Sequence, residues 1–128
     1  MAKYKFGSKP KTFSKNIKWK EVDGNSLELQ IVFNTATSDE CAEMLTVMFD
    51  TVNKERGGVE VADMPIKDIV KTNRQGAADF LLKAINSWEL EDDLTRDNVL
   101  RFMNEQPGGS EAAITAFRDA CMQGRMGN

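Results

Sequence analysis

The chain of 128 residues has the length of one globular domain, and its content of 41% hydrophobic and 29% charged residues is typical of a soluble protein. Its apolar runs fall far short of the roughly 20 residues that a membrane-spanning helix needs, and the lysine-rich start is not followed by the apolar stretch of a secretory signal. These features exclude a membrane span and lead us to expect a cytosolic protein, and the absence of histidine removes the commonest general base and zinc ligand.

The net charge of −3 hides a strong division along the chain. Residues 1–20 carry seven lysines and no acid, whereas ten basic and twenty acidic residues follow them, a net charge of −10. A basic segment joined to an acidic body can bind a polyanion, but it can also bind the acidic surface of a second copy of the same protein. The composition leaves both partners open.

Residues 1–12 combine lysine, glycine, serine and proline with only two aromatic rings. So little apolar area does not offset the entropy lost on ordering the backbone. We therefore predict a flexible basic arm over residues 1–12 and a single α+β domain over residues 13–128. The candidate residues for self-association through this arm are Lys3, Lys5, Lys9 and Lys11.

Alternating apolar residues on both sides of Asp23 and Gly24 predict an N-terminal β-hairpin over about residues 13–34. Both apolar rows must lie on one face of the sheet, so directly paired residues must have numbers of equal parity. A two-residue turn at Asp23 and Gly24 fails this condition, whereas a three-residue loop at 22–24, with Gly24 in the left-handed conformation, satisfies it. The expected pairs are Trp19 with Leu27, Ile17 with Leu29, and Phe13 with Phe33.

The residues after the hairpin predict a mainly α-helical body of four or five helices over residues 37–124. Thr37 and Glu40 have the spacing of a capping box, in which each side chain binds a backbone N–H of the other residue. They mark the start of a first helix, which Gly57 and Gly58 end.

A second helical stretch opens near Pro65 and has its widest apolar stripe over residues 77–88. Asn73 and Gly76 are poor helix residues and favour a break or kink between the two parts. We expect residues 77–88 to form the most buried helix, with Trp88 largely buried at its end.

Two shorter helices complete the prediction. Thr95 follows an acidic loop at residues 89–93 and caps a helix over about residues 96–105. Residues 107–109, Pro-Gly-Gly, then break the chain, and Ser110 caps a last helix. The residues of that helix that should face inward are Ile114, Phe117 and Cys121.

No arrangement of residues in the sequence points to catalysis or to a bound cofactor. Pairs of Asp and Glu lie in polar segments, where nothing would raise a carboxyl pKa for acid–base work. The acidic loop lacks the spacing and the glycine of a calcium loop, and residues 108–110 are not followed by the lysine of a phosphate loop. Cys41 and Cys121 are far apart in sequence, which favours buried thiols over a disulfide or redox pair. We therefore expect no enzyme activity, cofactor or metal site.

The sequence is rich in methionine, with seven residues, and this enrichment points to a partner-binding surface. Flexible thioethers suit a surface that accepts varied apolar partners, although any single methionine can also fill a gap in the core. The candidate partner-binding residues are Met44, Met48, Met122 and Met126.

The lysine arm, interleaved with Tyr4 and Phe6, also has the composition of a nucleic-acid-binding segment. The acidic body, about a Debye length away, cancels part of the attraction of the arm for a polyanion. A small nucleic-acid-binding protein is therefore the alternative function, and we expect nucleic acid to be the less favoured partner.

The order of these parts resembles the tail assembly chaperones of long-tailed bacteriophages, including prophage copies. One departure is Glu89, which follows Trp88 where the family often has glycine. The matching segments, in chain order, are Lys9-Pro10-Lys11-Thr12-Phe13, the hairpin through Asp23-Gly24, Ile85-Asn86-Ser87-Trp88, Asn98-Val99-Leu100, Pro107-Gly108, Ala112-Ala113-Ile114 with Ala116-Phe117, and Gly124-Arg125-Met126-Gly127-Asn128.

This resemblance implies a non-catalytic protein that binds the long, helical tape measure protein and keeps it soluble while tail tube subunits assemble around it. It implies action in the host cytoplasm and absence from the mature virion, with the tail tube protein as a further candidate partner. An extended helix with exposed apolar stripes aggregates unless a partner covers them, and many copies of a small protein can cover them through weak multivalent contacts. We also expect a homo-oligomer, because a hairpin has two open edges and the arm and body have opposite charges.

Overall fold

A three-stranded antiparallel sheet and four helices make up the described residues, 5–56 and 66–123, of this computed structural model. The sheet has the strand order β1-β2-β3. The predicted α+β class and the helical body after the hairpin are confirmed. In chain order the elements are β1 (Thr12–Lys20), β2 (Ser26–Asn34), α1 (Ser38–Arg56), α2 (Ile66–Ala84), β3 (Ile85–Trp88), α3 (Arg96–Glu105) and α4 (Pro107–Gln123).

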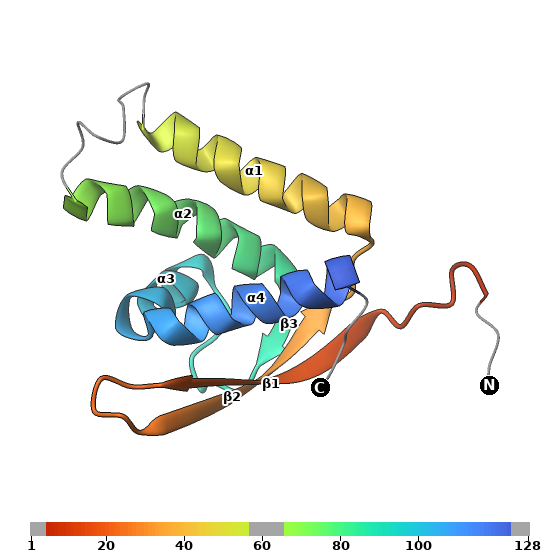
Figure 1. The fold of residues 1–128 in the computed structure, drawn as a ribbon, viewed down its shortest axis with the longest axis horizontal. Coiled ribbons are helices and arrows are strands. Elements are labelled where there is room, and N and C mark those ends of the chain that lie inside the picture. The colour runs from red at the N-terminus through yellow and green to blue at the C-terminus, as the bar shows by residue number, and fades with distance from the viewer. Residues whose placement is uncertain (1–4, 57–65, 124–128) are drawn as a thin grey trace.

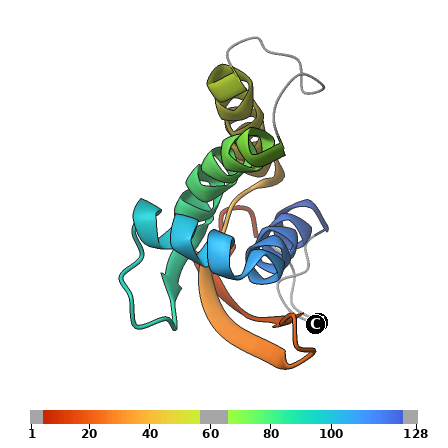
Figure 2. The ribbon, with the colours of Figure 1, turned by 90° about the vertical axis from the view of Figure 1, so that its left-hand side faces the viewer.

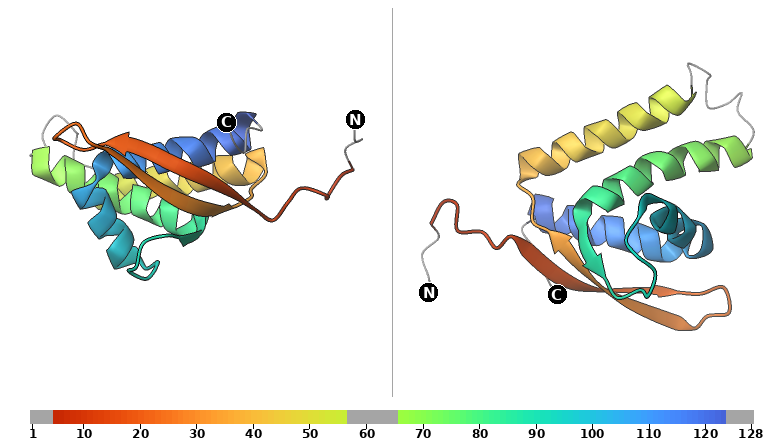
Figure 3. Two further views of the ribbon diagram at one scale, coloured as in Figure 1. Left: turned by 90° about the horizontal axis from the view of Figure 1, so that it is seen from below. Right: turned by 180° about the vertical axis from the view of Figure 1, so that it is seen from behind.

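The helices lie on one side of the sheet (Figure 1). Viewed from the side, α4 is close to the strands, whereas α1 and α2 form a pair farther away (Figure 2). Seen from below, the strands lie in front of the helices, and no described helix covers their outer face (Figure 3). None of the described helices is both long and apolar enough to cross a membrane.

The hairpin has the predicted register. Trp19 pairs with Leu27, Ile17 with Leu29, and Phe13 with Phe33. The loop is closed by hydrogen bonds from the Glu21 N–H to the Asn25 carbonyl (2.8 Å) and from the Gly24 N–H to the Glu21 carbonyl (2.9 Å), and Gly24 has a φ of 88°. This is the three-residue loop that equal parity requires, with glycine at the left-handed position.

The core lies between the inner face of the sheet and the helices. Phe117 of α4 is almost completely buried, and its ring centroid lies 5.7 Å from that of Phe33 in β2 and 5.6 Å from that of Phe80 in α2. Phe13 stacks on Phe33 at 5.3 Å. These four rings join four elements, β1, β2, α2 and α4, through contacts of the kind that aromatic pairs prefer. Of the residues expected to face inward on α4, Phe117 and Cys121 are buried, and Ile114 is half-buried.

Two of the three predicted helix caps, at Thr37 and Thr95, are confirmed. The Glu40 carboxylate accepts a hydrogen bond from the Thr37 N–H (3.0 Å), and the Glu40 N–H donates to the Thr37 hydroxyl (3.2 Å). The Thr37 N–H, followed by the Thr37 hydroxyl, lowers the pKa of the Glu40 carboxyl below its usual value by stabilising the carboxylate. At α3, the Thr95 hydroxyl accepts a hydrogen bond from the Asn98 N–H. α1 ends at Arg56, and the expected stop at residues 57 and 58 lies outside the described residues.

The prediction for residues 77–88 is wrong at its end. α2 stops at Ala84, and residues 85–88 form β3, which pairs with the outer edge of β2. The apolar spacing of residues 77–88 fits a helix, but backbone pairing with β2 overrides it for the last four residues. Trp88 is half-buried rather than largely buried, and one of the two hairpin edges expected to be open is occupied by β3.

Two further expectations about the helices are wrong. α2 runs without interruption through Asn73 and Gly76, and Gly76 is buried, which is consistent with tertiary packing outweighing its low helix propensity. α4 begins at Pro107, so Ser110 lies inside the first turn instead of capping it, and its hydroxyl donates to the Pro107 carbonyl (3.0 Å). Proline is well suited to the first helical position because it has no N–H that needs a partner.

The two glycines after Pro107 allow α4 to pack closely on aromatic rings. A β-carbon added at Gly109 would lie 2.8 Å from Cζ of Phe102 and 2.9 Å from Cε2 of Trp19, closer than real β-carbons approach other atoms. At Gly108 the closest atom would be Cδ1 of Trp19 at 3.5 Å, an ordinary contact. The start of α4 can therefore pack this closely on Trp19 only because residue 109 has no side chain.

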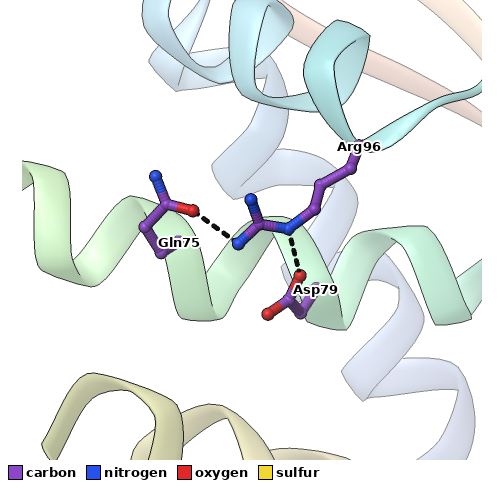
Figure 4. Close-up of polar contacts among 3 residues, drawn as sticks. All are labelled: Gln75, Asp79 and Arg96. Carbon is purple, nitrogen blue, oxygen red and sulfur yellow. Dashed lines mark hydrogen bonds and ion pairs between the residues drawn. The ribbon is translucent and has the colours of Figure 1, made fainter. Parts of the chain in front are cut away.

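An ion pair connects α3 to α2 on the surface (Figure 4). The Arg96 guanidinium donates from Nε to Oδ1 of Asp79 at 2.7 Å and also donates to the side-chain oxygen of Gln75. Both charged side chains are partly exposed, so this contact positions α3 more than it stabilises the fold.

The two glycines give a matched test of the packing at α4. Gly109→Ala should destabilise the protein by about 1–3 kcal/mol, because Trp19 or Phe102 must move to admit the methyl group. Gly108→Ala should change the free energy of unfolding by less than about 1 kcal/mol and in the stabilising direction, because the methyl group has room and alanine restricts the unfolded chain. Urea denaturation of both variants measures the difference, and equal effects would contradict the close approach at Gly109.

Candidate functional site

The methionines proposed from the sequence fall into different environments. Met44 and Met48, one turn apart on α1, are half-buried against the core. Met122, near the end of α4, is 53% exposed. Met126 lies outside the described residues. By contrast Met103, which was not among the candidates, is buried in the core.

Two buried cysteine thiols interact with each other, one at the start of α1 and one near the end of α4. Cys41 and Cys121 are both buried and free, as the sequence predicted. The sequence did not predict that the two thiols lie within hydrogen-bonding reach of each other. Since Met44 follows Cys41 by less than one turn, and Met122 adjoins Cys121, the contact places both methionines at the same end of the molecule.

A groove of about 300 Å³ runs beside the first half of α1, and we call it the α1 groove. Its polar residues include Glu40 and Lys83, and Met122 does not line it. Val47, 44% exposed, continues its apolar wall along α1. The residues that line it are Asn34, Thr35, Ala36, Glu40, Glu43, Met44, Val47, Lys83 and Phe117.

A second cavity of about 300 Å³ lies where the hairpin loop end meets α3. We call it the aromatic socket and define it by the rings of Trp19, Trp88 and Phe102, together with Leu90 at its mouth. The Phe102 centroid lies 5.9 Å from that of Trp19 and 6.0 Å from that of Trp88, both in edge-to-face geometry. The remaining residues that line it are Leu27, Glu28, Leu29, Asp92, Asn98, Arg101, Glu105 and Gln106.

Hydrogen bonds fix both indole rings of the aromatic socket. Trp19 Nε1 donates to Oε1 of Gln106 (2.9 Å), and Trp88 Nε1 donates to the backbone carbonyl of Asp92 (2.9 Å). The indole N–H groups therefore need no partner from a ligand. Sequence reasoning missed this cavity because it placed Trp88 on a helix, although the parity rule had already put Trp19 on the inner face of the sheet.

The described part of the basic arm approaches the end of β2. Lys5, Lys9 and Lys11 are exposed, and Lys3 lies outside the described residues. The Lys11 carbonyl accepts a hydrogen bond from the Thr35 N–H (2.9 Å), and Nζ of Lys9 lies 3.4 Å from the Ala36 carbonyl oxygen. The base of the arm is therefore attached to the body.

A larger and more open groove of about 810 Å³ separates β1 from α4. β1 is the edge of the sheet and pairs on its outer side with no described strand. Lys15 and Lys18 line one wall, and Glu111 and Asp119 line the other. The described acidic and cysteine side chains form no cluster of three or more that could hold a metal ion.

Comparison with known proteins gives one match. A family model described as phage tail assembly chaperone matches residues 1–128. No curated protein and no solved structure matches the chain.

The contact between the two thiols predicts an effect of pH on stability. Burial, followed by the neighbouring Cys41 thiol, raises the pKa of Cys121 from 9.0 to about 11. The unfolded chain therefore loses this proton near pH 9, whereas the folded protein keeps it until about pH 11, so the free energy of unfolding should fall as the pH rises through this window. Chemical denaturation between pH 8 and pH 11 measures the fall.

Cys121→Ala is the control, because it removes the thiol and leaves the other ionisable side chains in place. The fall in stability should be smaller in this variant. Alkylation of folded wild-type protein by iodoacetamide at pH 9 should also be slower than alkylation in urea, since the thiolate is the reactive form. Equal pH slopes for the two proteins would show that Cys121 is not perturbed.

Proposed function

The chain belongs to the phage tail assembly chaperone family, and on this premise we propose that it binds the tape measure protein and keeps it soluble while tail tube subunits assemble around it. Membership of the family assigns it a role in tail assembly, which requires protein partners. The binding of the tape measure protein is the step that we add. The observation that supports it best is the incompletely covered apolar side of α1.

The first three turns of α1 leave part of their apolar side exposed. Cys41 is fully buried, but Met44, Leu45 and Met48 are only half-buried. The spacing of these residues makes one continuous stripe along the helix. A helical segment of a partner could lie along this stripe with Met44 and Val47 in the α1 groove at its side. Flexible methionine side chains would allow the same surface to accept different segments of a long protein.

The expected energy of one such contact is small. Burial of about 400 Å² of apolar surface yields roughly 10 kcal/mol at ~25 cal/mol per Å². Association costs about 4–15 kcal/mol in lost translational and rotational freedom, which offsets most of that gain. A single copy should therefore bind weakly, and solubility of the partner would depend on many copies bound along its length.

The remaining parts of the proposal follow from this role. The protein needs no catalytic chemistry or cofactor, acts in the host cytoplasm, and leaves before the virion is mature. The tail tube protein is a further candidate partner, because its subunits must replace the chaperone around the tape measure protein. The charge of the lysine arm is available for contacts between copies, and nothing in the described contacts favours nucleic acid.

Co-expression with the tape measure protein tests the proposed surface. The double variant Met44→Gln, Met48→Gln keeps side-chain length and helix propensity but makes the stripe polar. It should lower the amount of tape measure protein in the soluble fraction at least tenfold. Met122→Gln and Met126→Gln, made separately, test whether the end of α4 contributes. Quantification of both proteins in supernatant and pellet gives the measurement.

Asp50→Asn is the matched control, because residue 50 lies on the side of α1 opposite Cys41 and is exposed. It should leave the tape measure protein soluble. Circular dichroism and denaturation must show that each variant is folded. If the folded methionine variants keep the tape measure protein as soluble as the wild type does, the stripe on α1 is not its binding site.

A further inference from the structure

The first turn of the described chain presents an aromatic ring to solvent. The Ser8 N–H and the Ser8 hydroxyl both donate to the Lys5 carbonyl, and Gly7 has a φ of 80°. This geometry matches a type II turn, with Phe6 at its second position and glycine at its third. Phe6 is 95% exposed. Aromatic residues, phenylalanine among them, are enriched in the cores of protein interfaces.

The aromatic socket has the size and lining to receive such a ring. Its volume of about 300 Å³ is at the lower end for ligand pockets, which suits a side chain. Aromatic rings prefer edge-to-face neighbours at centroid distances of about 4.5–7 Å, so Trp19, Trp88 and Phe102 can surround another ring. Both indole N–H groups already have partners, so an apolar ring leaves no polar group unpaired there.

The charges of the turn and of the socket are opposite. Lys5 and Lys9 lie on either side of Phe6 in sequence, and both are exposed. Carboxylates of Glu28, Asp92 and Glu105 line the socket, with Arg101 as its one basic residue among the lining side chains. Arg101 pairs with Glu105 at 3.1 Å, and Lys18, which does not line the socket, pairs with Glu28 at 3.6 Å, so the lining of three acids and one base keeps a net negative charge. The rim therefore favours the approach of a lysine-flanked ring.

The Phe6 ring does not reach the socket of its own chain. The socket lies at the hairpin loop end of β1, whereas the arm leaves from the opposite end (Figure 1). Lys11, attached to Thr35, is separated from Trp19 by eight strand residues, or about 26 Å. Five residues from Lys11 to Phe6 span at most about 18 Å, and the turn shortens this reach.

We propose that Phe6 of one copy inserts into the aromatic socket of a second copy. Each copy carries one ring and one socket at opposite ends of β1, so the contact has a direction and can repeat from copy to copy. If this contact repeats, it links many copies into a chain. The apolar stripe on α1 takes no part in the contact and stays available for a partner. The contact needs no tape measure protein and stands independently of the proposed function.

The test measures the mass of the purified full-length chain, in the absence of the tape measure protein, by light scattering over a concentration series. Phe6→Ser removes the ring, and Leu90→Lys places a cation at the mouth of the socket on an exposed loop residue. Each variant should weaken self-association at least tenfold. Val22→Ser is the matched control, because it removes an equally exposed apolar side chain that does not line the socket, and it should have no effect.

Mixing the two variants gives the decisive result. Phe6→Ser copies keep an intact socket and Leu90→Lys copies keep an intact arm, so a mixture should form a one-to-one dimer although each variant alone is monomeric. A wild-type monomer at high concentration, a Phe6→Ser variant with wild-type mass, or a mixture that stays monomeric would overturn the proposal. The proposal would also fail if Leu90→Lys lowered the solubility of the tape measure protein but left the oligomer mass unchanged. In that case a segment of the tape measure protein, and not Phe6, would occupy the aromatic socket.

Discussion

The burial of Phe117 against Phe33 is the contact that joins the helices to the sheet. β2 supplies one ring and α4 the other, and Phe80 of α2 meets Phe117 from a third direction. Burial of a phenylalanine side chain contributes about 1.5–3 kcal/mol, and each well-oriented ring pair adds about 0.5–1.5 kcal/mol. The total is a large share of the 5–15 kcal/mol that holds a domain folded. α4 is therefore fixed at its middle, and both of its ends are positioned by that anchor.

The two ends of α4 shape the two candidate surfaces. At its start, Gly109 lies against Trp19 and Phe102, which form walls of the aromatic socket. Near its end, Cys121 is buried and interacts with Cys41 of α1, the helix that lines the α1 groove. A buried aromatic contact in the core thus determines the geometry of two places where partners could bind, and Phe117 itself lines the α1 groove.

The sequence predicted the features that depend on neighbours along the chain, and it missed those that depend on distant segments. The rule that paired residues have numbers of equal parity predicted the hairpin register, and the capping residues Thr37 and Thr95 predicted the starts of α1 and α3. Both features depend only on residues that are close together in the sequence. Residues 85–88 have apolar spacing that fits a helix, and only the free edge of β2 makes them a strand, with an irregular register opposite Val32 and Phe33. The contact of Cys41 with Cys121 and the aromatic socket both need the assembled fold, so composition could point to methionines such as Met44 but not to the rings of the socket.

The polar outer face of the sheet and the lysines of β1 affect how the strands of two copies can pair. Its exposed residues on β1 are polar or charged, including Lys18 and Lys20, and β1 itself is an edge strand. Lysines on an edge strand disfavour edge-to-edge pairing with an identical strand, because like charges would be brought into register. The open edge of β1 is therefore a poor template for pairing with the same edge of a second copy, whatever contacts the partly exposed apolar side of α1 makes.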